Sequence, residues 1–240
     1  MNSSSSIDHR PAKSHWEFDA QVSSCFPDMA RRSIPLYDQT VSELVRFVGR
    51  VMARTPKQWI DLGSARGRVI EEALAVYGRA PAFCMVEPSQ PMFDLLNNTA
   101  LFDGIDKRCQ DALSVLTSYA DESVDVVSCM WTMQFVPIDQ RQTIFKEIRR
   151  VLRSDGVMLY AEKLEGQTPR FADLLRERYE DFKVSNGYSR ESIALKRDAL
   201  KGVMTPISAP ANKALANNAG FDMEEVLRFF NFAAWICLPR

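Results

Sequence analysis

The chain has 240 residues, of which 46% are hydrophobic and 25% are charged, and its formal net charge at pH 7 is -1. These values are typical of a globular protein with a full hydrophobic core. They exclude a global attraction to nucleic acid or to an anionic membrane, and no apolar run approaches the ~20 residues that a membrane span needs.

The start of the chain differs in composition from the rest. Residues 1–15 are rich in serine and lack the apolar core of a secretory signal, so we interpret them as a disordered tail before a single domain over residues 16–240. The five cysteines are scattered, and both histidines lie near the start of the chain. We therefore expect neither a disulfide framework nor a metal site, and a cytoplasmic location.

Helical and strand-like patterns alternate along the chain. In chain order we predict a helix over 38–53, a strand over 58–62, a glycine loop over 63–67, a helix over about 68–77, a strand over 82–86, a helix over about 90–98, a weak strand before Asp111, a buried strand over 124–130 and an amphipathic helix over 138–152.

The last third of the chain holds a charged stretch between strand patterns. There we predict a turn at 154–156, a strand over 157–162, a helical insertion over about 167–218 with breaks near Gly187 and Pro206, and two closing strands over 226–230 and 232–238. Strands that alternate with helices favour an α/β fold with a mostly parallel sheet and helices on both faces. The closing pair would add an antiparallel hairpin.

The sequence Asp61-Leu62-Gly63-Ser64-Ala65-Arg66-Gly67 lies between a predicted strand and a predicted helix. Glycines at such a turn let the backbone approach a ligand, and the amides of the next helix bind polar groups. The spacing is not G-x-G-x-x-G and no Walker lysine follows, which favours an adenosyl or aminoacyl ligand over a pyrophosphate. A purely structural turn is the alternative.

Two acidic positions follow the next strands. Glu87 ends a predicted strand, where an acid can accept hydrogen bonds from ribose hydroxyls, although a solvated side chain is the alternative. Asp111, followed by Ala112, could receive an adenine amino group or could cap a helix.

Three further segments have candidate roles at the carboxyl ends of the predicted parallel strands, where ligands of such sheets bind. The segment from Met130 to Phe135 could form a wall for adenine or a sulfonium, or could be core. The segment Arg31-Arg32-Ser33-Ile34-Pro35-Leu36-Tyr37 could cap a pocket and bind a carboxylate. Its arginines could instead be solvated, as could Lys196-Arg197.

Taken together, these segments resemble the carboxy-S-adenosyl-L-methionine synthase family, over nearly all of residues 16–238. The resemblance rests on Phe18-Asp19, Phe26-Pro27-Asp28-Met29, Arg32-Ser33-Ile34-Pro35, Tyr37, Asp61-Leu62-Gly63, Gln134-Phe135, Ala161-Glu162-Lys163, Asp181-Phe182-Lys183, Asn186-Gly187-Tyr188-Ser189, Lys196-Arg197, Ala219-Gly220-Phe221 and Phe230-Asn231-Phe232.

The resemblance implies a Rossmann-like class I methyltransferase fold with a seven-stranded sheet. It implies an enzyme that uses S-adenosyl-L-methionine and prephenate to make carboxy-S-adenosyl-L-methionine, which a partner transferase then uses on wobble uridine in tRNA. The cofactor residues implied or expected at that edge are Tyr37, Asp61, Gly63, Ser64, Ala65, Glu87, Asp111, Ala112 and Met130. Tyr37 and Arg197 are the expected catalytic residues, with Arg197 reaching the added carboxylate from the neighbouring subunit of a homodimer.

The chain departs from the family pattern around the expected cofactor. Met130 stands where the family has Asn, Glu87-Pro88 where it has Asp-Asn, and Leu36 where it has Gly, and Arg66 and Arg68 replace small or apolar residues. A methyltransferase that acts on another small acceptor is therefore a second hypothesis. Because no general base is obvious, a non-catalytic protein that binds an adenosyl ligand is a third.

Overall fold

The computed structural model describes residues 16–240, so the predicted tail over residues 1–15 lies outside the described residues. In chain order the elements are α1 (Ala20–Ser33), α2 (Tyr37–Val51), β1 (Gln58–Leu62), α3 (Arg68–Tyr77), β2 (Ala82–Val86), α4 (Gln90–Asn97), η1 (Ala100–Phe102), β3 (Asp106–Arg108), α5 (Ala112–Thr117), β4 (Val124–Met130), η2 (Met133–Phe135), α6 (Ile138–Val151), β5 (Leu152–Lys163), α7 (Pro169–Ser185), α8 (Arg190–Ala199), α9 (Ala209–Ala219), β6 (Phe221–Phe229) and β7 (Phe232–Pro239).

The strands of the described chain form one seven-stranded sheet in the order β3-β2-β1-β4-β5-β7-β6. The first five strands are parallel to one another, whereas β7 runs antiparallel to both β5 and β6. This order confirms the predicted fold, a Rossmann-like class I methyltransferase sheet with a closing hairpin.

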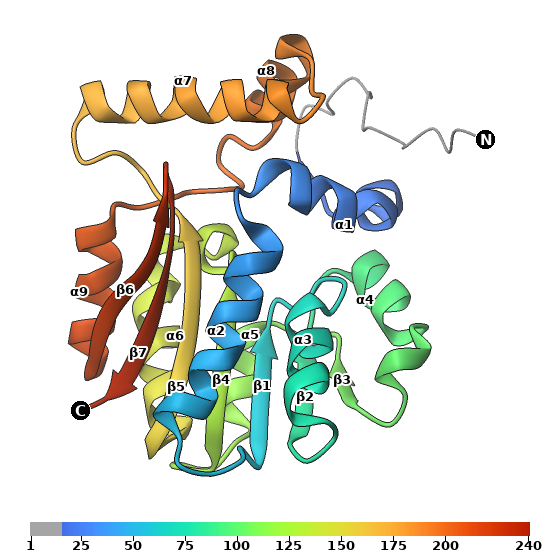
Figure 1. Cartoon of the computed structure of the whole chain (residues 1–240), viewed down its shortest axis with the longest axis vertical. Coiled ribbons are helices and arrows are strands. Elements are labelled where there is room, and N and C mark those ends of the chain that lie inside the picture. The colour runs from blue at the N-terminus through green and yellow to red at the C-terminus, as the bar shows by residue number, and fades with distance from the viewer. Residues whose placement is uncertain (1–15) are drawn as a thin grey trace.

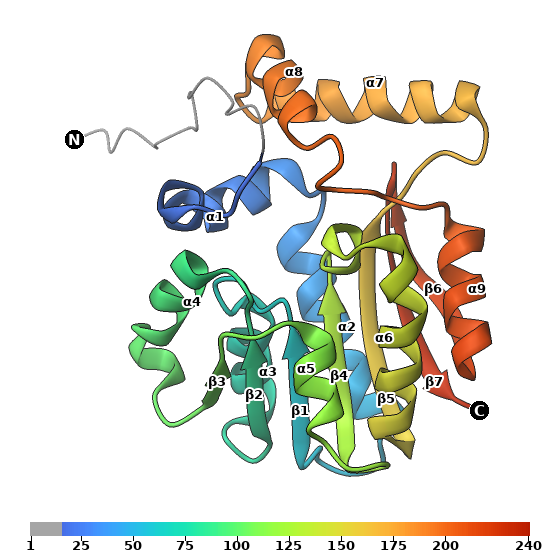
Figure 2. The same cartoon turned by 180° about the vertical axis from the view of Figure 1, so that it is seen from behind.

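Helices cover both faces of the sheet (Figures 1 and 2). On one face lie α2 and α3, and Val45 and Ile70 belong to a core cluster with Trp59. The other face carries α5, α6 and α9, where Phe145 packs edge-on against Tyr160. Every position of β4 is buried between these layers, and the strand is accordingly apolar except at Asp125 and Ser128.

A third group of helices covers neither face. Figure 1 shows α1, α7 and α8 beyond the carboxyl ends of β1, β4 and β5. The N–H of Trp16, just before α1, donates to the carbonyl of Ala199 at the end of α8 at 3.0 Å. The predicted helical character of residues 167–218 is confirmed, with a break at Gly187, whose φ is 91°.

The structure corrects two predictions in the second half of the chain. The predicted turn at 154–156 is wrong, because β5 runs through it from Leu152 and its register against β4 shifts between Val124 and Val126. Strand β6 begins at Phe221 rather than near residue 226. No helix among the described residues is long and apolar enough to cross a membrane.

Helix α1 has no counterpart among the predicted elements. Its N-cap is Asp19, whose side chain accepts the N–H of Val22 at 2.9 Å. It contains Pro27 and ends with Arg31 and Arg32 in its last turn, where cations are favourable. A helix with an internal proline and few apolar residues at helical spacing is not predicted by hydrophobic periodicity.

Candidate active site

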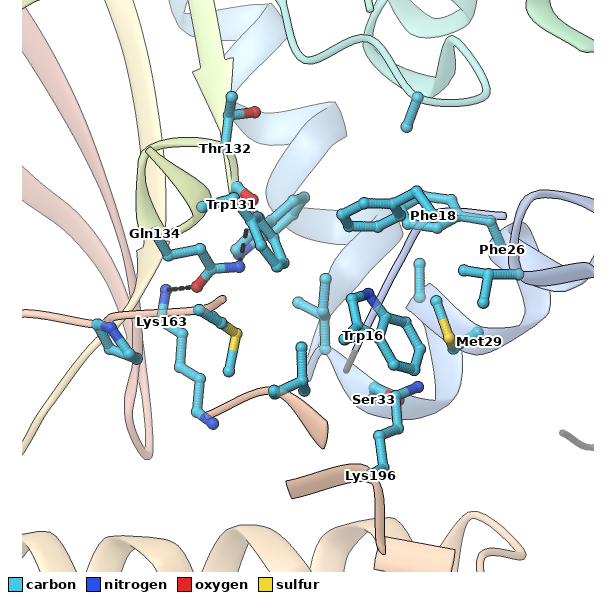
Figure 3. Close-up of a pocket in the computed structure, with 18 of the residues that line it drawn as sticks. Trp16, Phe18, Phe26, Met29, Ser33, Trp131, Thr132, Gln134, Lys163 and Lys196 are labelled. Carbon is cyan, nitrogen blue, oxygen red and sulfur yellow. Dashed lines mark hydrogen bonds between the residues drawn. The ribbon is translucent and has the colours of Figure 1, made fainter. Parts of the chain in front are cut away.

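A cavity of about 970 Å³ lies at the carboxyl edge of the parallel strands. The loop after β1 and the residues that follow β2 and β4 form its base. Its roof comes from the segment before α1, from α1 itself and from α8, and its remaining side from the end of β5 and from α7. Figure 3 shows Trp131 and Gln134 on one side and Trp16 and Met29 on another, with Lys163 and Lys196 below. Ligands of open parallel sheets bind at this edge.

The glycine loop is part of the base, through Gly63, Ser64 and Ala65. Gly63 has φ 72°, and a Cβ there would lie 2.2 Å from Oγ1 of Thr132. Gly67 has φ 81°, and its Cβ would lie 2.4 Å from the ring of Phe102. Both glycines are therefore required by the turn and by neighbouring side chains, in addition to any approach of a ligand.

Glu87 lies on the cavity wall directly after β2 and is only 7% exposed. One carboxylate oxygen accepts the N–H of Ala65 and the other accepts the N–H of Ser89, each at 2.9 Å. Burial raises the pKa of Glu87. The backbone thus fixes the carboxylate and leaves lone pairs that can accept hydroxyl protons.

Asp61 lies beneath the loop and does not line this cavity. Its Oδ1 accepts from the hydroxyl of Ser128 at 2.5 Å, and that hydroxyl accepts the indole N–H of Trp59 at 3.0 Å. Burial raises the pKa of Asp61 to about 6, and its Oδ2 has no partner among the described residues. The side chain of Asp61 therefore joins β1 to β4, while its backbone carbonyl accepts from the hydroxyl of Ser64 in the loop at 3.0 Å. A contact between Asp61 and the cofactor stays a prediction.

Asp111 and Ala112 lie outside the cavity wall. Asp111 is exposed and caps α5 by accepting from the N–H of Ser114 at 2.9 Å and from its hydroxyl at 2.6 Å. These hydrogen bonds hold the pKa of Asp111 below its usual value. The alternative helix-cap role of Asp111 is thus present, and an adenine contact stays a prediction.

An aromatic pair forms another part of the wall. The rings of Tyr37 and Trp131 are 4.9 Å apart between centroids, inclined at 34°, and both face the cavity beside Met130. Trp131 has φ 55° and its buried indole N–H has no partner among the described residues. Burial raises the pKa of Tyr37 above its ordinary value. The wall can therefore offer aromatic faces and one free donor.

The structure separates the predicted basic residues. Arg31 pairs with Asp38 at 2.7 Å and Arg32 with Asp28 at 3.0 Å, and neither lines the cavity. Arg197 does line it, from α8, and its guanidinium is paired with Glu180 of α7. Its expected reach into a neighbouring subunit stays a prediction.

Several cavity residues had no predicted role. Trp16 and Phe18 stack edge-on with centroids 6.2 Å apart at the roof, and Lys163 and Lys183 line the side formed by β5 and α7. Most of them lie within the segments on which the family resemblance rests, but their residue types and spacing alone do not predict that they line one cavity. Among the described residues, no group of three or more His, Cys, Asp or Glu side chains could hold a metal ion.

Comparisons with known proteins extend this description. The family described as "Methyltransferase domain" matches residues 60–160. The chain is 30% identical over 229 residues to carboxy-S-adenosyl-L-methionine synthase of Nautilia profundicola, covering 95% of this chain and 96% of that one. It is 32% identical over 231 residues to the enzyme of the same name from Helicobacter hepaticus, covering 92% and 93%. The PH0226 protein of Pyrococcus horikoshii has a similar fold, with a TM-score of 0.65 and 16% identity over 93% of this chain and all of that one.

Proposed function

Because the chain belongs to the carboxy-S-adenosyl-L-methionine synthase family, we propose that its cavity binds S-adenosyl-L-methionine beside a small carboxylic acid. The enzyme is an S-adenosylmethionine-dependent transferase. In the proposed overall reaction, the acid is prephenate, which gives up its ring carboxyl group and its ring hydroxyl and leaves as phenylpyruvate. The methyl group of S-adenosylmethionine exchanges one hydrogen for that carboxyl group, and the hydrogen leaves with the hydroxyl as water. Use of the product on tRNA wobble uridine by a partner transferase, in the cytoplasm and without direct nucleic-acid contact by this chain, completes the proposal.

One observation carries this proposal: a cofactor-type loop and a group of cations share one cavity. Gly63, Ser64, Ala65 and Glu87 line its base, and Lys163, Lys183 and Arg197 line the side formed by β5, α7 and α8. A methyl group offers a cation nothing, whereas a carboxylate accepts charge-assisted hydrogen bonds from it. The cations therefore favour a reaction in which a carboxylate is present.

The residues at the base fit S-adenosylmethionine. Glu87 keeps carboxylate lone pairs free for the two hydroxyls of a ribose, and the unpartnered indole N–H of Trp131 is available to an acceptor. When bound, the cofactor supplies a sulfonium and the methyl carbon that this cation activates. Tyr37 and Trp131 present aromatic faces to the cavity, and such faces attract a cation.

Arg197 is proposed to hold the carboxylate that the cofactor acquires. A guanidinium stays charged at every relevant pH, and its planar fork matches the two oxygens of a carboxylate. Its present partner is Glu180, so a bound carboxylate would compete with that side chain for the guanidinium.

We also propose that two copies associate through α7. Its Phe171 is 59% exposed and its Leu174 is 51% exposed. A second copy placed on this face would cover both side chains and bring α8, with Arg197, next to an interface. Sedimentation at micromolar concentration should give a dimer, and a Phe171→Asp, Leu174→Asp variant should give a monomer. A wild-type monomer with full activity would exclude the assembly.

The decisive test is the identity of the ligand and of the product. The purified chain is denatured, and the released small molecules are measured by mass spectrometry. A second sample, kept native, is incubated with S-adenosylmethionine and prephenate, and its products are measured in the same way. Carboxylated cofactor in either measurement supports the proposal, whereas a chain that binds S-adenosylmethionine but gives no carboxylated product contradicts it.

One observation favours the second hypothesis, a methyltransferase acting on another small molecule. Met130 lies on the cavity wall, where the family pattern has Asn, and it brings a flexible apolar side chain to that position. That activity predicts demethylated cofactor among the released molecules. A Met130→Asn variant that gains a carboxylation activity absent from wild type would support it, whereas wild type that carboxylates at least as fast as this variant would count against it.

A further inference from the structure

Two lysines from different elements converge on one tyrosine ring in the cavity wall. The Nζ atom of Lys163, at the end of β5, lies 4.7 Å from the centre of the Tyr179 ring, and Nζ of Lys183 lies 4.6 Å from it. Lys183 is only 9% exposed. The Tyr179 ring packs in turn against Phe232 with centroids 5.2 Å apart. The ring thus attracts both ammonium groups but cannot neutralise them.

The carboxylates near this cluster do not pair with the two lysines. Among residues 16–240, neither ammonium forms an ion pair, and Glu180 of α7 is bound to Arg197. Glu165 follows β5 and Glu180 lies on α7, and both attract the ammonium group of Lys163 by Coulombic interaction without forming an ion pair with it. Cations therefore outnumber available anions on this side of the cavity.

Further positive charge faces Lys183 from the neighbouring helix. Lys196 and Arg197 of α8 both disfavour its charged form, as does Lys163 of β5. Burial and these neighbours lower the pKa of Lys183 to about 7, and burial lowers that of Lys163 to about 8. An anion placed among these groups would be stabilised by all of them.

We propose that Lys163 and Lys183 form an anion subsite that binds a carboxylate of the second substrate. The inference rests on the proposed function and adds to it the residues that hold the donor, which must carry a second carboxylate. A donor that gives up one carboxyl group needs another anionic group to hold it in place. The lysine pair takes the carboxylate that the donor keeps, and Arg197 takes the one that is transferred.

The experiment compares donor binding with cofactor binding. Wild type, Lys163→Met and Lys183→Met are saturated with S-adenosylhomocysteine and titrated with prephenate by calorimetry. Methionine keeps the unbranched apolar stem and removes the charge. Each variant should bind prephenate about tenfold more weakly or worse, with unchanged affinity for S-adenosylmethionine. Lys213→Met, at an exposed position on α9, is the matched control and should change neither affinity.

A packing role for the lysines predicts different results. Lower melting temperatures together with equal losses of both ligands would assign the pair to packing and overturn the subsite. Lys183→Arg keeps the charge and should retain more donor affinity than Lys183→Met. Unchanged prephenate affinity in both methionine variants, with normal cofactor binding, would overturn the subsite alone. A wild-type chain that binds no S-adenosylmethionine would overturn the proposed function with it.

Discussion

Replacement of Glu87 by alanine tests the base of the cavity directly. In the folded chain its carboxylate accepts the N–H groups of Ala65 and Ser89, each at 2.9 Å, and it is 7% exposed. Alanine removes the charged acceptor that we assign to the ribose hydroxyls. A hydrogen bond to a charged group is worth about 1.5–3 kcal/mol, which corresponds to a loss of roughly 10- to 150-fold in affinity.

Glutamine at position 87 keeps the size of the side chain but removes its charge and one of its two acceptor oxygens. Its amide has one acceptor oxygen, so either Ala65 or Ser89 faces an NH₂ group and one hydroxyl acceptor is lost. Glu87→Gln should therefore weaken cofactor binding by about tenfold or more. Calorimetric titration with S-adenosylmethionine is the assay, with thermal unfolding of the free chain to confirm folding. Glu224→Ala, at an exposed position on β6, is the control. Wild-type affinity in a folded Glu87→Ala variant would refute the reasoning.

Three further predictions concern charge, strain and pH. Arg197→Leu should weaken the binding of carboxylated cofactor at least about tenfold more than the binding of S-adenosylmethionine, and Arg197→Lys should recover part of the loss. Calorimetry of both ligands is the measurement, with Arg190→Leu on the same helix as the control. Equal losses of both ligands, or the same result in the control, would contradict the prediction. Leu36 has φ 55° at an exposed position, so Leu36→Gly should raise the free energy of unfolding by about 1 kcal/mol in urea titrations, and a decrease would show that its backbone is not strained. Burial raises the pKa of Glu162 from 4.5 to about 8. Between these two pH values the folded chain keeps a proton that the unfolded chain releases. The free energy of unfolding should therefore fall as pH rises through this range, by at most about 1.4 kcal/mol per pH unit. Glu162→Gln should flatten that pH profile of unfolding free energy, and an unchanged slope would assign the effect to other groups.

Local patterns predicted the strands and loops of the sheet closely. The strands over 58–62, 82–86 and 124–130 have the predicted bounds, because short apolar runs bounded by glycine or polar residues suit strands buried on both faces. The turn predicted at 154–156 failed for the opposite reason. Its Ser-Asp-Gly composition is typical of a turn, but the residues lie within β5 as an irregularity between two paired positions, Leu152 with Val124 and Val157 with Val126.

The site was predictable only where it follows the sheet edge. The glycine loop and Glu87 come directly after strands, so topology alone brings them together. Lys163 ends β5 and Lys183 lies near the end of α7, and they meet only because that helix brings the ring of Tyr179 next to both of them. Asp111 is also at a strand end, but an N-cap interaction with Ser114 occupies its side chain.

The cavity has a base and a roof of separate origin. The base is built from loops of the sheet, whereas the roof is built from α1 and α8, which the hydrogen bond between Trp16 and Ala199 joins across the opening. Two of the groups that we propose to hold the acid, Lys183 and Arg197, lie on α7 and α8, outside the sheet and the loop after β1. A duplicated gene of this kind could acquire a new acid substrate by drift in these two helices, while selection preserves use of the same nucleoside. Chimaeras that exchange only α7 and α8 would transfer acid preference between relatives.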